Sequence, residues 1–294
     1  MPSPLLRKGV LLAGGRGARL DPLTRVVNKH LLPVHGKPMI YYPLSTLLLG
    51  GIREILIVTN PEYVPAFETL LGDGASLGVR FSYAAQASPR GIADAFLLAE
   101  NFLAGEGCAL ILGDSLFTGP LYFVQDASRV PRGATIYSYL VSDSSPYGVV
   151  ELDAKGSPVG LEEKPARPRS KLAVPGLYVL DGDAVRFART LTPSARGELE
   201  ILDLLGKYLN AGMLRVTPLA RDVAWLDMGT IESLTRAAAV VADIETHQGL
   251  RIGYLEEISV RMKYRTPSEM RATISTYPQS PYRAHLETLL EEMT

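Results

Sequence analysis

The sequence predicts an α/β protein with a mixed, mostly parallel central sheet and helices on both faces. Two observations favour this class. In the first half of the chain, short apolar strand patterns alternate with helix patterns, which is typical of parallel strands joined by helical crossovers. In the second half, strand patterns follow one another with only short turns between them, which indicates an antiparallel extension of the sheet.

The first half opens with a buried strand at Gly9–Ala13 that runs into a glycine-rich turn. A helix is predicted at Pro38–Gly50, because proline is favoured at the start of a helix and the glycine pair at 50–51 stops it. The elements expected after it alternate between strand and helix: strand Glu54–Thr59, helix Tyr63–Leu71, strand Val79–Ala84, helix Ile92–Leu103 and strand Ala109–Leu112.

The second half is expected to begin with the strands Thr135–Val141, Tyr147–Leu152, Val159–Glu163 and Val174–Leu180. The elements expected after these are helices Asp183–Thr190 and Glu198–Ala211, strands Leu214–Pro218 and Val223–Leu226, and helices Thr230–His247 and His285–Met293. We expect 267–280 to be irregular. With no long linker, low-complexity tract or internal repeat, the chain is predicted to form one unit.

Composition bounds the possible functions. The chain has 294 residues, of which 47% are hydrophobic, and a formal net charge of −1. That balance argues against a general nucleic-acid or membrane surface, so any anion site must be local. Cys108 is the only cysteine, the four histidines show no metal-type spacing, and no apolar run is long enough for a signal or membrane anchor. We expect a soluble cytoplasmic protein.

The turn after the first strand combines the glycines 14, 15 and 17 with Arg16 and Arg19. Glycines let the backbone approach a bulky group, and arginines favour an anion, so the turn resembles a phosphate cradle. It is not a Walker loop, since no Gly-Lys-Ser/Thr follows, and Leu20 stands where a dinucleotide fingerprint has its third glycine. A plain tight turn with solvated arginines remains the alternative.

Charged side chains follow other predicted strands. Asp114 and Asp227 each follow an apolar strand, and two such carboxylates can hold Mg²⁺ against phosphate oxygens. The alternative is that they are turn residues, with Asp227 capping the helix that begins at Thr230. Lys29 precedes an apolar anchor that would fix it beside the glycine turn, although a solvated surface lysine is the more common case.

A second basic site is indicated by Glu162-Glu-Lys-Pro165. A residue before proline favours an extended backbone, so Lys164 is expected to be held extended and aimed at a second phosphate. Glu163 can accept hydrogen bonds from sugar hydroxyls. Two phosphate-directed basic clusters on either side of a possible Mg²⁺ site fit nucleotidyl transfer, which needs no general base or covalent intermediate.

At this point the chain resembles the sugar nucleotidyltransferases. The resemblance covers roughly residues 8–260 and rests on the order of several motifs: Leu12-Ala-Gly-Gly-x-Gly-x-Arg-Leu20, Pro38-Met-Ile-Tyr-Tyr-Pro43, Tyr147-Gly-Val-Val150, Glu162-Glu-Lys-Pro165, Ser194-Ala-Arg-Gly-Glu-Leu-Glu-Ile201 and Trp225-Leu-Asp-x-Gly-Thr230. It implies a Rossmann-like nucleotidyltransferase fold, a homotetramer, and Mg²⁺-dependent transfer from dTTP to glucose 1-phosphate. A second, regulatory nucleotide site is implied only by the family.

The resemblance also implies residue roles. Catalysis would fall to Arg19, Lys29, Asp114 and Lys164, and Mg²⁺ to Asp114 and Asp227. The nucleotide would be bound by Leu12, Gly14, Gly15, Gly17, Arg19, Lys29, Gln86, Gly91 and Asp114. The sugar phosphate would be bound by Gly148, Glu163, Lys164 and Val174. The expected parts are a nucleotide-binding half (1–130), a sugar-phosphate-binding half (131–260) and a C-terminal segment (261–294) that does not resemble the family.

The chain departs from the family pattern at Ala18, His30, Arg90, Ser115, Pro175 and Leu202. These positions carry mostly hydroxyl and amide groups in the family, whereas the charged machinery is retained here. UTP or another hexose 1-phosphate is therefore an alternative substrate. An alternative of another class is a nucleotide-sugar-binding regulatory protein with impaired catalysis. A dehydrogenase is less well supported, because the third fingerprint glycine and an acidic ribose partner are missing.

Overall fold

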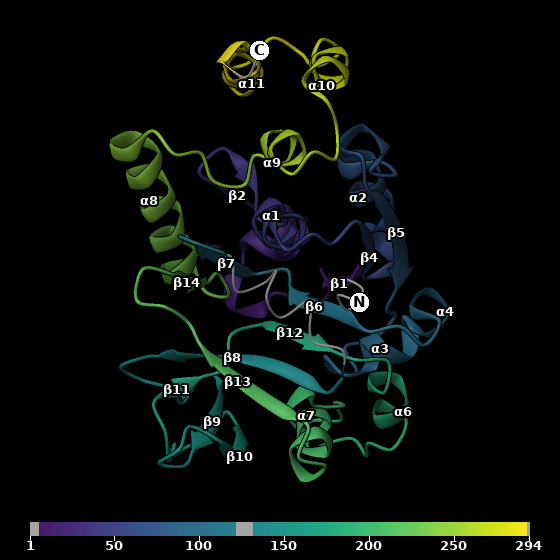
Figure 1. Cartoon of the computed structure of the whole chain (residues 1–294), viewed down its shortest axis with the longest axis vertical. Helices are drawn as coiled ribbons and strands as arrows, with labels where there is room; N and C mark the ends of the chain where they lie inside the picture. Colours follow the sequence, from purple (N-terminus) through teal and green to yellow (C-terminus); the bar gives the residue numbers. More distant parts are fainter. Residues whose placement is uncertain (1–5, 122–131, 293–294) are drawn as a thin grey trace.

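A ten-stranded sheet forms the centre of the computed structural model, which describes residues 6–121 and 132–292 (Figure 1). Its strands are β1 (Lys8–Leu12), β4 (Glu54–Thr59), β5 (Arg80–Ala85), β6 (Cys108–Leu112), β8 (Ala134–Leu140), β9 (Gly148–Leu152), β10 (Pro158–Glu163), β11 (Leu172–Ala173), β12 (Leu177–Leu180) and β13 (Leu214–Pro218). The order is β10-β9-β11-β8-β12-β6-β1-β4-β5, with β13 beside β8.

The two halves of the sheet differ as the sequence predicts. Strands β6, β1, β4 and β5 are parallel neighbours. Strand β12 is antiparallel to both β6 and β8, and β9, β10 and β11 continue antiparallel beyond them. Strand β13 pairs with β8 in parallel. The α/β class with a mixed sheet is confirmed.

Ten helices surround the sheet in the described ranges: α1 (Tyr41–Leu49), α2 (Val64–Leu71), α3 (Asp94–Leu98), α4 (Glu100–Leu103), α6 (Ala184–Ala188), α7 (Ile201–Asn210), α8 (Ile231–Gln248), α9 (Leu255–Arg261), α10 (Pro267–Ile274) and α11 (Pro281–Glu292). Figure 1 shows α1 and α2 on one side of the sheet and α3, α6 and α7 on the other. Within the described ranges, no helix is both long and apolar enough to cross a membrane.

Successive residues of the parallel strands enter different cores, which explains their continuous apolar runs. Val10 and Leu110 lie in the core shared with α3 and α7, whereas their neighbours Leu11 and Ile111 lie in the core shared with α1 and α2. All four side chains are fully buried. A strand covered on both faces needs an apolar residue at every position.

Two pairs of short strands lie outside the main sheet, and neither pairing was predicted from the sequence. Strands β2 (Pro33–Val34) and β3 (Lys37–Pro38) form a hairpin, which delays the start of α1 to Tyr41. Strand β7 (Ser115–Thr118), which was not predicted, pairs antiparallel with β14 (Ala224–Asp227). This β7–β14 ribbon joins segments that are more than 100 positions apart.

Local chemistry accounts for the remaining differences in the second half. The strand expected at Val174–Leu180 is interrupted at Pro175-Gly176, because proline has no N–H for the ladder. The segment 267–280 is not irregular throughout, since α10 fills its first part. Thr266 and Glu269 form a reciprocal capping box, with Pro267 in the first turn. These helix-start signals are visible in the sequence.

The C-terminal helices belong to the main core. Met270, Ile274, Leu286 and Leu290 are buried in the core that also holds α1. The buried carboxylate of Glu256 accepts hydrogen bonds from two tyrosine hydroxyls of the same region, at 2.8 and 2.6 Å. Residues 261–292 are thus packed against the rest of the chain. The predicted boundary at 130–131 lies outside the described residues.

Candidate active site

A cavity of about 310 Å³ opens at the carboxyl ends of β1 and β6, where ligands bind in open α/β sheets. Nearly all the predicted site residues line it: Leu12, Gly14, Gly15, Arg19, Lys29, Gln86, Gly91, Asp114, Gly148, Glu163, Lys164, Val174 and Asp227. Gly17 is the exception. The fold therefore gathers residues from both halves of the chain around one space.

The glycine turn after β1 has two parts with different tasks. Gly15 has φ +93° and open space around its α-carbon, so the backbone itself faces the cavity. Gly17, at φ +61°, packs against Thr24, whose hydroxyl donates to its carbonyl oxygen at 3.0 Å. Gly17 precedes the short 3-10 helix Ala18–Leu20 that carries Arg19. Its role is to shape the turn and not to line the cavity.

Lys29 and Asp114 form an ion pair at the floor of the cavity, with side chains 16% and 12% exposed. Burial of Asp114 opposes its ionisation, but the charge and hydrogen bond of Lys29 outweigh this effect and lower its pKa to about 2. Asp114 is consequently ionised at neutral pH. Lys29 is therefore fixed in the cavity, and the alternative of a solvated surface lysine does not hold.

Asp227 is the last residue of β14 and pairs in register with Ser115 of β7. The backbone N–H of Met228 donates to the carbonyl oxygen of Asp114 at 2.9 Å, which ties the two acidic segments together. Burial and the negative charge of Asp114 raise the pKa of Asp227 to about 6. Asp227 does not cap α8: that helix is capped by Thr230 in a capping box with Ser233.

The two carboxylates fit a hard cation. Their mutual repulsion is what a bound divalent ion would relieve, and carboxylate oxygens are preferred Mg²⁺ ligands. Within the described residues, no cluster of three or more His, Cys, Asp or Glu side chains exists that could hold a metal. A two-carboxylate site suits Mg²⁺, which completes its coordination with water and substrate oxygens.

His30 lies directly behind this floor and is fully buried. The carbonyl oxygen of the Asn28 side chain lies 2.8 Å from Nδ1 of His30. Because that oxygen only accepts, Nδ1 carries the proton. A methyl group on Gly113 would lie 2.5 Å from Cδ2 of His30, so the glycine before Asp114 makes room for the ring.

Replacing His30 with glutamine is expected to weaken the acid sensitivity of the fold. Burial and the charge of Lys29 lower the pKa of His30 to about 3. The unfolded chain takes up a proton below about pH 6.5, but the folded chain does not until about pH 3. Folded stability therefore falls with decreasing pH in that window, by up to about 1.4 kcal/mol per pH unit.

Urea unfolding followed by circular dichroism at several pH values between 7 and 4 measures this contribution. The His30→Gln curve should be shallower than that of the unaltered protein, whatever constant offset the new side chain adds. Parallel curves would show that His30 does not stay neutral in the folded state.

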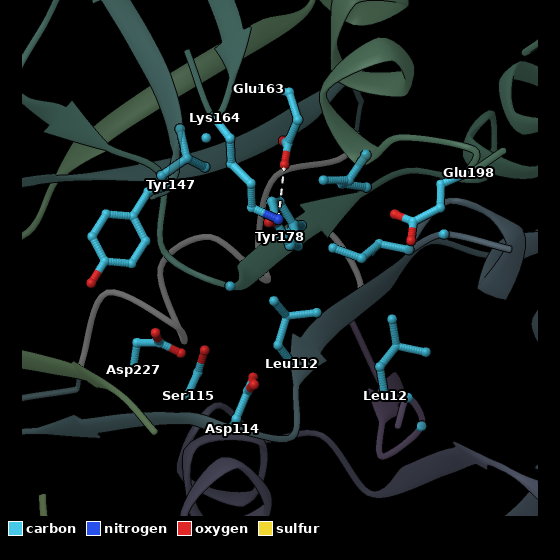
Figure 2. Close-up of a pocket in the computed structure, with 18 of the residues that line it drawn as sticks. Leu12, Leu112, Asp114, Ser115, Tyr147, Glu163, Lys164, Tyr178, Glu198 and Asp227 are labelled. Atoms are coloured by element: carbon cyan, nitrogen blue, oxygen red, sulfur yellow. Dashed lines mark ion pairs between the residues drawn. The ribbon is translucent and has the colours of Figure 1, made fainter. Parts of the chain in front are cut away.

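The opposite wall of the cavity carries Lys164 and Glu163 from the end of β10 (Figure 2). Figure 2 shows both side chains pointing from this wall toward Asp114 and Asp227, with a Lys164 Nζ–Glu163 Oε1 ion pair of 3.4 Å. Lys164 is not extended, contrary to the prediction. Its φ is +43°, and its N–H donates to the carbonyl oxygen of Tyr147 at 3.1 Å. Such strain is common where a side chain is aimed at a ligand.

The third wall is a loop around Gly91, whose backbone is held by the segment before α7. The N–H of Leu199 donates to the carbonyl oxygen of Arg90 at 2.7 Å, and that of Ala93 donates to Leu199 at 3.1 Å. Gly91 has φ +98°, and a β-carbon there would lie 2.3 Å from the Leu199 carbonyl oxygen. The loop and the 194–200 segment therefore fit together only with glycine at this position.

Replacing Gly91 with alanine is expected to destabilise the fold by about 2–3 kcal/mol, because backbone strain adds to a clash with backbone atoms. Gly156 is a matched control, since its φ of +82° is similar but nothing lies within 4 Å of the added methyl. Gly156→Ala should cost about 1 kcal/mol. Chemical denaturation of both variants provides the comparison, and equal losses would show that the contact with Leu199 is unimportant.

Several cavity residues were missed by sequence reasoning, most of them neighbours of predicted ones. Tyr147 and Trp225 pack ring to ring at 5.0 Å and stand beside Gly148 and near Asp227 in the sequence. Both belong to motifs that carry the family resemblance, Tyr147-Gly-Val-Val150 and Trp225-Leu-Asp-x-Gly-Thr230, so the sequence did contain a signal for them. The other unpredicted lining residues are His30, Pro89, Ile92, Leu112, Ser115, Pro146, Gly176, Tyr178, Glu198, Ile201 and Leu202.

Comparison with known proteins matches this geometry to a family. Residues 8–244 match the family model described as nucleotidyl transferase. A glucose-1-phosphate thymidylyltransferase from Neisseria meningitidis is 47% identical over 287 residues, which cover 97% of this chain and all of that one. One of the same name from Mycobacterium tuberculosis is 46% identical over 97% of this chain and 99% of its own. Alignments of this coverage include most of residues 261–294, so the expectation that this segment does not resemble the family is wrong.

Solved structures agree on the fold. A crystal structure from Bacillus anthracis, provisionally assigned as a glucose-1-phosphate thymidylyltransferase and bound to sucrose, has a TM-score of 0.75 and 39% identity, covering 81% of this chain and 96% of that one. A UDP-glucose pyrophosphorylase complexed with UDP-glucose has a TM-score of 0.70 at 23% identity, covering 81% of this chain and 99% of that one. The second likeness concerns the fold alone.

Proposed function

The chain belongs to the nucleotidyl transferase family, and we propose that it transfers a thymidylyl group from dTTP to glucose 1-phosphate, releasing pyrophosphate and dTDP-glucose. The observation that carries the proposal is the charge layout of the cavity. Lys29 pairs with Asp114, and the charges of Arg19 and Lys29 act on Asp227. Lys164 projects from the opposite wall toward the two carboxylates (Figure 2). Relatives that carry the name glucose-1-phosphate thymidylyltransferase support the choice of substrates.

The proposed reaction is a direct displacement. A phosphate oxygen of the sugar phosphate attacks the α-phosphorus of dTTP, the bond to the β-phosphate oxygen breaks, and pyrophosphate leaves with that oxygen. Arg19 and Lys29 bind the triphosphate and stabilise its charge, and Lys164 holds the phosphate of the sugar. The attacking oxygen is already anionic, so positioning and charge neutralisation suffice.

The remaining predicted residues complete the proposed subsites. The walls formed by Leu12, Gly14 and Gly15 lie against the nucleotide, and Gln86 and Gly91 lie against its pyrimidine base. The sugar lies against Gly148, Glu163 and Val174. Asp114 and Asp227 would hold Mg²⁺, which would supply a positive charge beside the phosphate oxygens. Lys29 pairs with Asp114 at this acidic floor and so balances the charge of one of the two carboxylates.

A pyrophosphate-release assay across nucleoside triphosphates and hexose 1-phosphates, with Mg²⁺ present, tests the proposal. The dTTP and glucose 1-phosphate pair should give the highest kcat/KM. Turnover that favours UTP or another hexose 1-phosphate would keep the chemistry and change the substrate. Nucleotide binding by calorimetry without turnover of any pair would instead identify a regulatory protein.

A further inference from the structure

A buried carboxylate lies behind the proposed base site and has two partners. Asp94, at the start of α3, is 4% exposed. Nε2 of Gln86 donates to its Oδ2 at 2.9 Å, while Nε of Arg90 lies 3.5 Å from its Oδ1. A buried carboxylate is tolerated when a charge and hydrogen bonds compensate it. Arg90, one of the departures from the family pattern, provides the charge.

The bond to Asp94 decides which way the Gln86 amide faces. An ionised carboxylate can only accept, so the NH₂ group of Gln86 must point at Asp94. The amide oxygen is then turned toward the glycine turn, 3.7 Å from where a β-carbon on Gly14 would lie. Within residues 6–121 and 132–292, no hydrogen-bond donor reaches this oxygen. Gln86 thus presents a free acceptor to the cavity.

The position of Gln86 is fixed as well as its orientation. Its backbone N–H donates to the carbonyl oxygen of Thr59 at 2.7 Å, which anchors it just beyond the ends of β4 and β5. Gln86 and Gly91 line the same cavity as Gly14 and Gly15. Hydrogen bonds hold both the backbone N–H and the side-chain NH₂ group of Gln86, which restricts the direction of its free amide oxygen.

We propose that Asp94 is a positioning residue for base selection, because it holds Gln86 as an acceptor that favours a ring N–H donor. Thymine and uracil carry such a donor at N3, whereas N3 of cytosine is itself an acceptor and would face the Gln86 oxygen unfavourably. This inference rests on the proposed function, in which Gln86 lies at the base. Selection of the base then depends on the linked side chains of Gln86, Asp94 and Arg90.

The Asp94→Asn variant tests the inference with an isosteric change. An asparagine can donate or accept, so Gln86 becomes free to rotate its amide and donate to N3 of cytosine. The preference for dTTP over dCTP in kcat/KM should fall about tenfold or more. Because Asp94 acts on binding of the base and not on the reacting phosphates, the change should appear in KM for the nucleotide more than in kcat.

Two further variants separate positioning from a general loss of structure. Asp183→Asn is the control, since Asp183 also pairs with an arginine, Arg186, but within the part of the chain that the structure describes has no hydrogen bond to a residue that lines the cavity. It should leave the dTTP preference unchanged. In a Gln86→Ala background, Asp94→Asn should have no further effect on selectivity, because the group through which it acts is gone.

The unaltered protein supplies a measurement that no folding defect can affect. Calorimetry should show that dTTP binds at least tenfold more tightly than dCTP or N3-methylated dTTP, both of which lack the N3 donor. Equal affinities for dTTP and dCTP, or an Asp94→Asn variant that keeps the full preference, would overturn the inference. Failure of the proposed function is distinct: the unaltered protein would then turn over no nucleotide and sugar phosphate pair.

Discussion

Replacing Asp114 with asparagine is expected to reduce kcat about a thousandfold while nucleotide binding is retained. The substitution removes one of the two carboxylates proposed to hold Mg²⁺, and charge stabilisation by a metal contributes several kcal/mol to a transition state. The side chain keeps its shape. Lys29, released from its ion pair, remains free to bind the triphosphate.

Steady-state kinetics at several Mg²⁺ concentrations, with calorimetry of nucleotide binding, measures both effects. Asp243→Asn is a suitable control, because Asp243 is an aspartate with a side chain 73% exposed on α8. A normal kcat in Asp114→Asn would show that the metal assignment is wrong. Loss of nucleotide binding together with turnover would instead assign Asp114 to the binding of the nucleotide.

Replacing Lys29 with methionine is expected to lower kcat/KM about a thousandfold and, unlike Asp114→Asn, to weaken nucleotide binding. Lys29 is a positive charge, its side chain 16% exposed, between the acidic floor and the glycine turn. Two unit charges 4 Å apart interact by about 4 kcal/mol at an effective dielectric constant of 20. Removing the lysine also leaves the Asp114 charge without its ion-pair partner, so the pKa of Asp114 should rise from about 2.

Calorimetry with dTTP and a kinetic comparison with Lys207→Met test this expectation. Lys207 is exposed on α7 and does not line the cavity, so its loss should leave both measurements unchanged. If Lys29→Met binds dTTP with unaltered affinity, the triphosphate does not contact Lys29. Thermal unfolding of the variant should be measured alongside, because an unpaired buried carboxylate is destabilising.

The parts of the fold that could be predicted from the sequence are those with a strong local signal. The apolar runs of β1, β4 and β6 are buried on both faces, and that requirement is visible residue by residue. The glycine turn and its charged neighbours stand directly after such strands. Chain order and strand ends were therefore enough to place most of the candidate site in one cavity.

The parts that could not be predicted depend on partners remote in sequence. Nothing local to Ser115–Thr118 says that it pairs with Ala224–Asp227. The left-handed backbone of Lys164 opposes the usual preference before proline, and a tertiary contact with Tyr147 accompanies it. Gly17 shares a motif with Gly15, yet only the structure separates the residue that shapes the turn from the one that lines the cavity.

The β7–β14 ribbon affects the order in which the site assembles while the polypeptide is being synthesised. A nascent chain that has emerged through β6 already carries the glycine turn, Lys29 and Asp114, but the partner strand of β7 begins only at Ala224. Closing a loop of that length is entropically costly and slow compared with forming the parallel strands. The acidic pair therefore assembles late. A ribosome-bound chain stalled before residue 224 does not yet contain Asp227, so it cannot form the acidic pair.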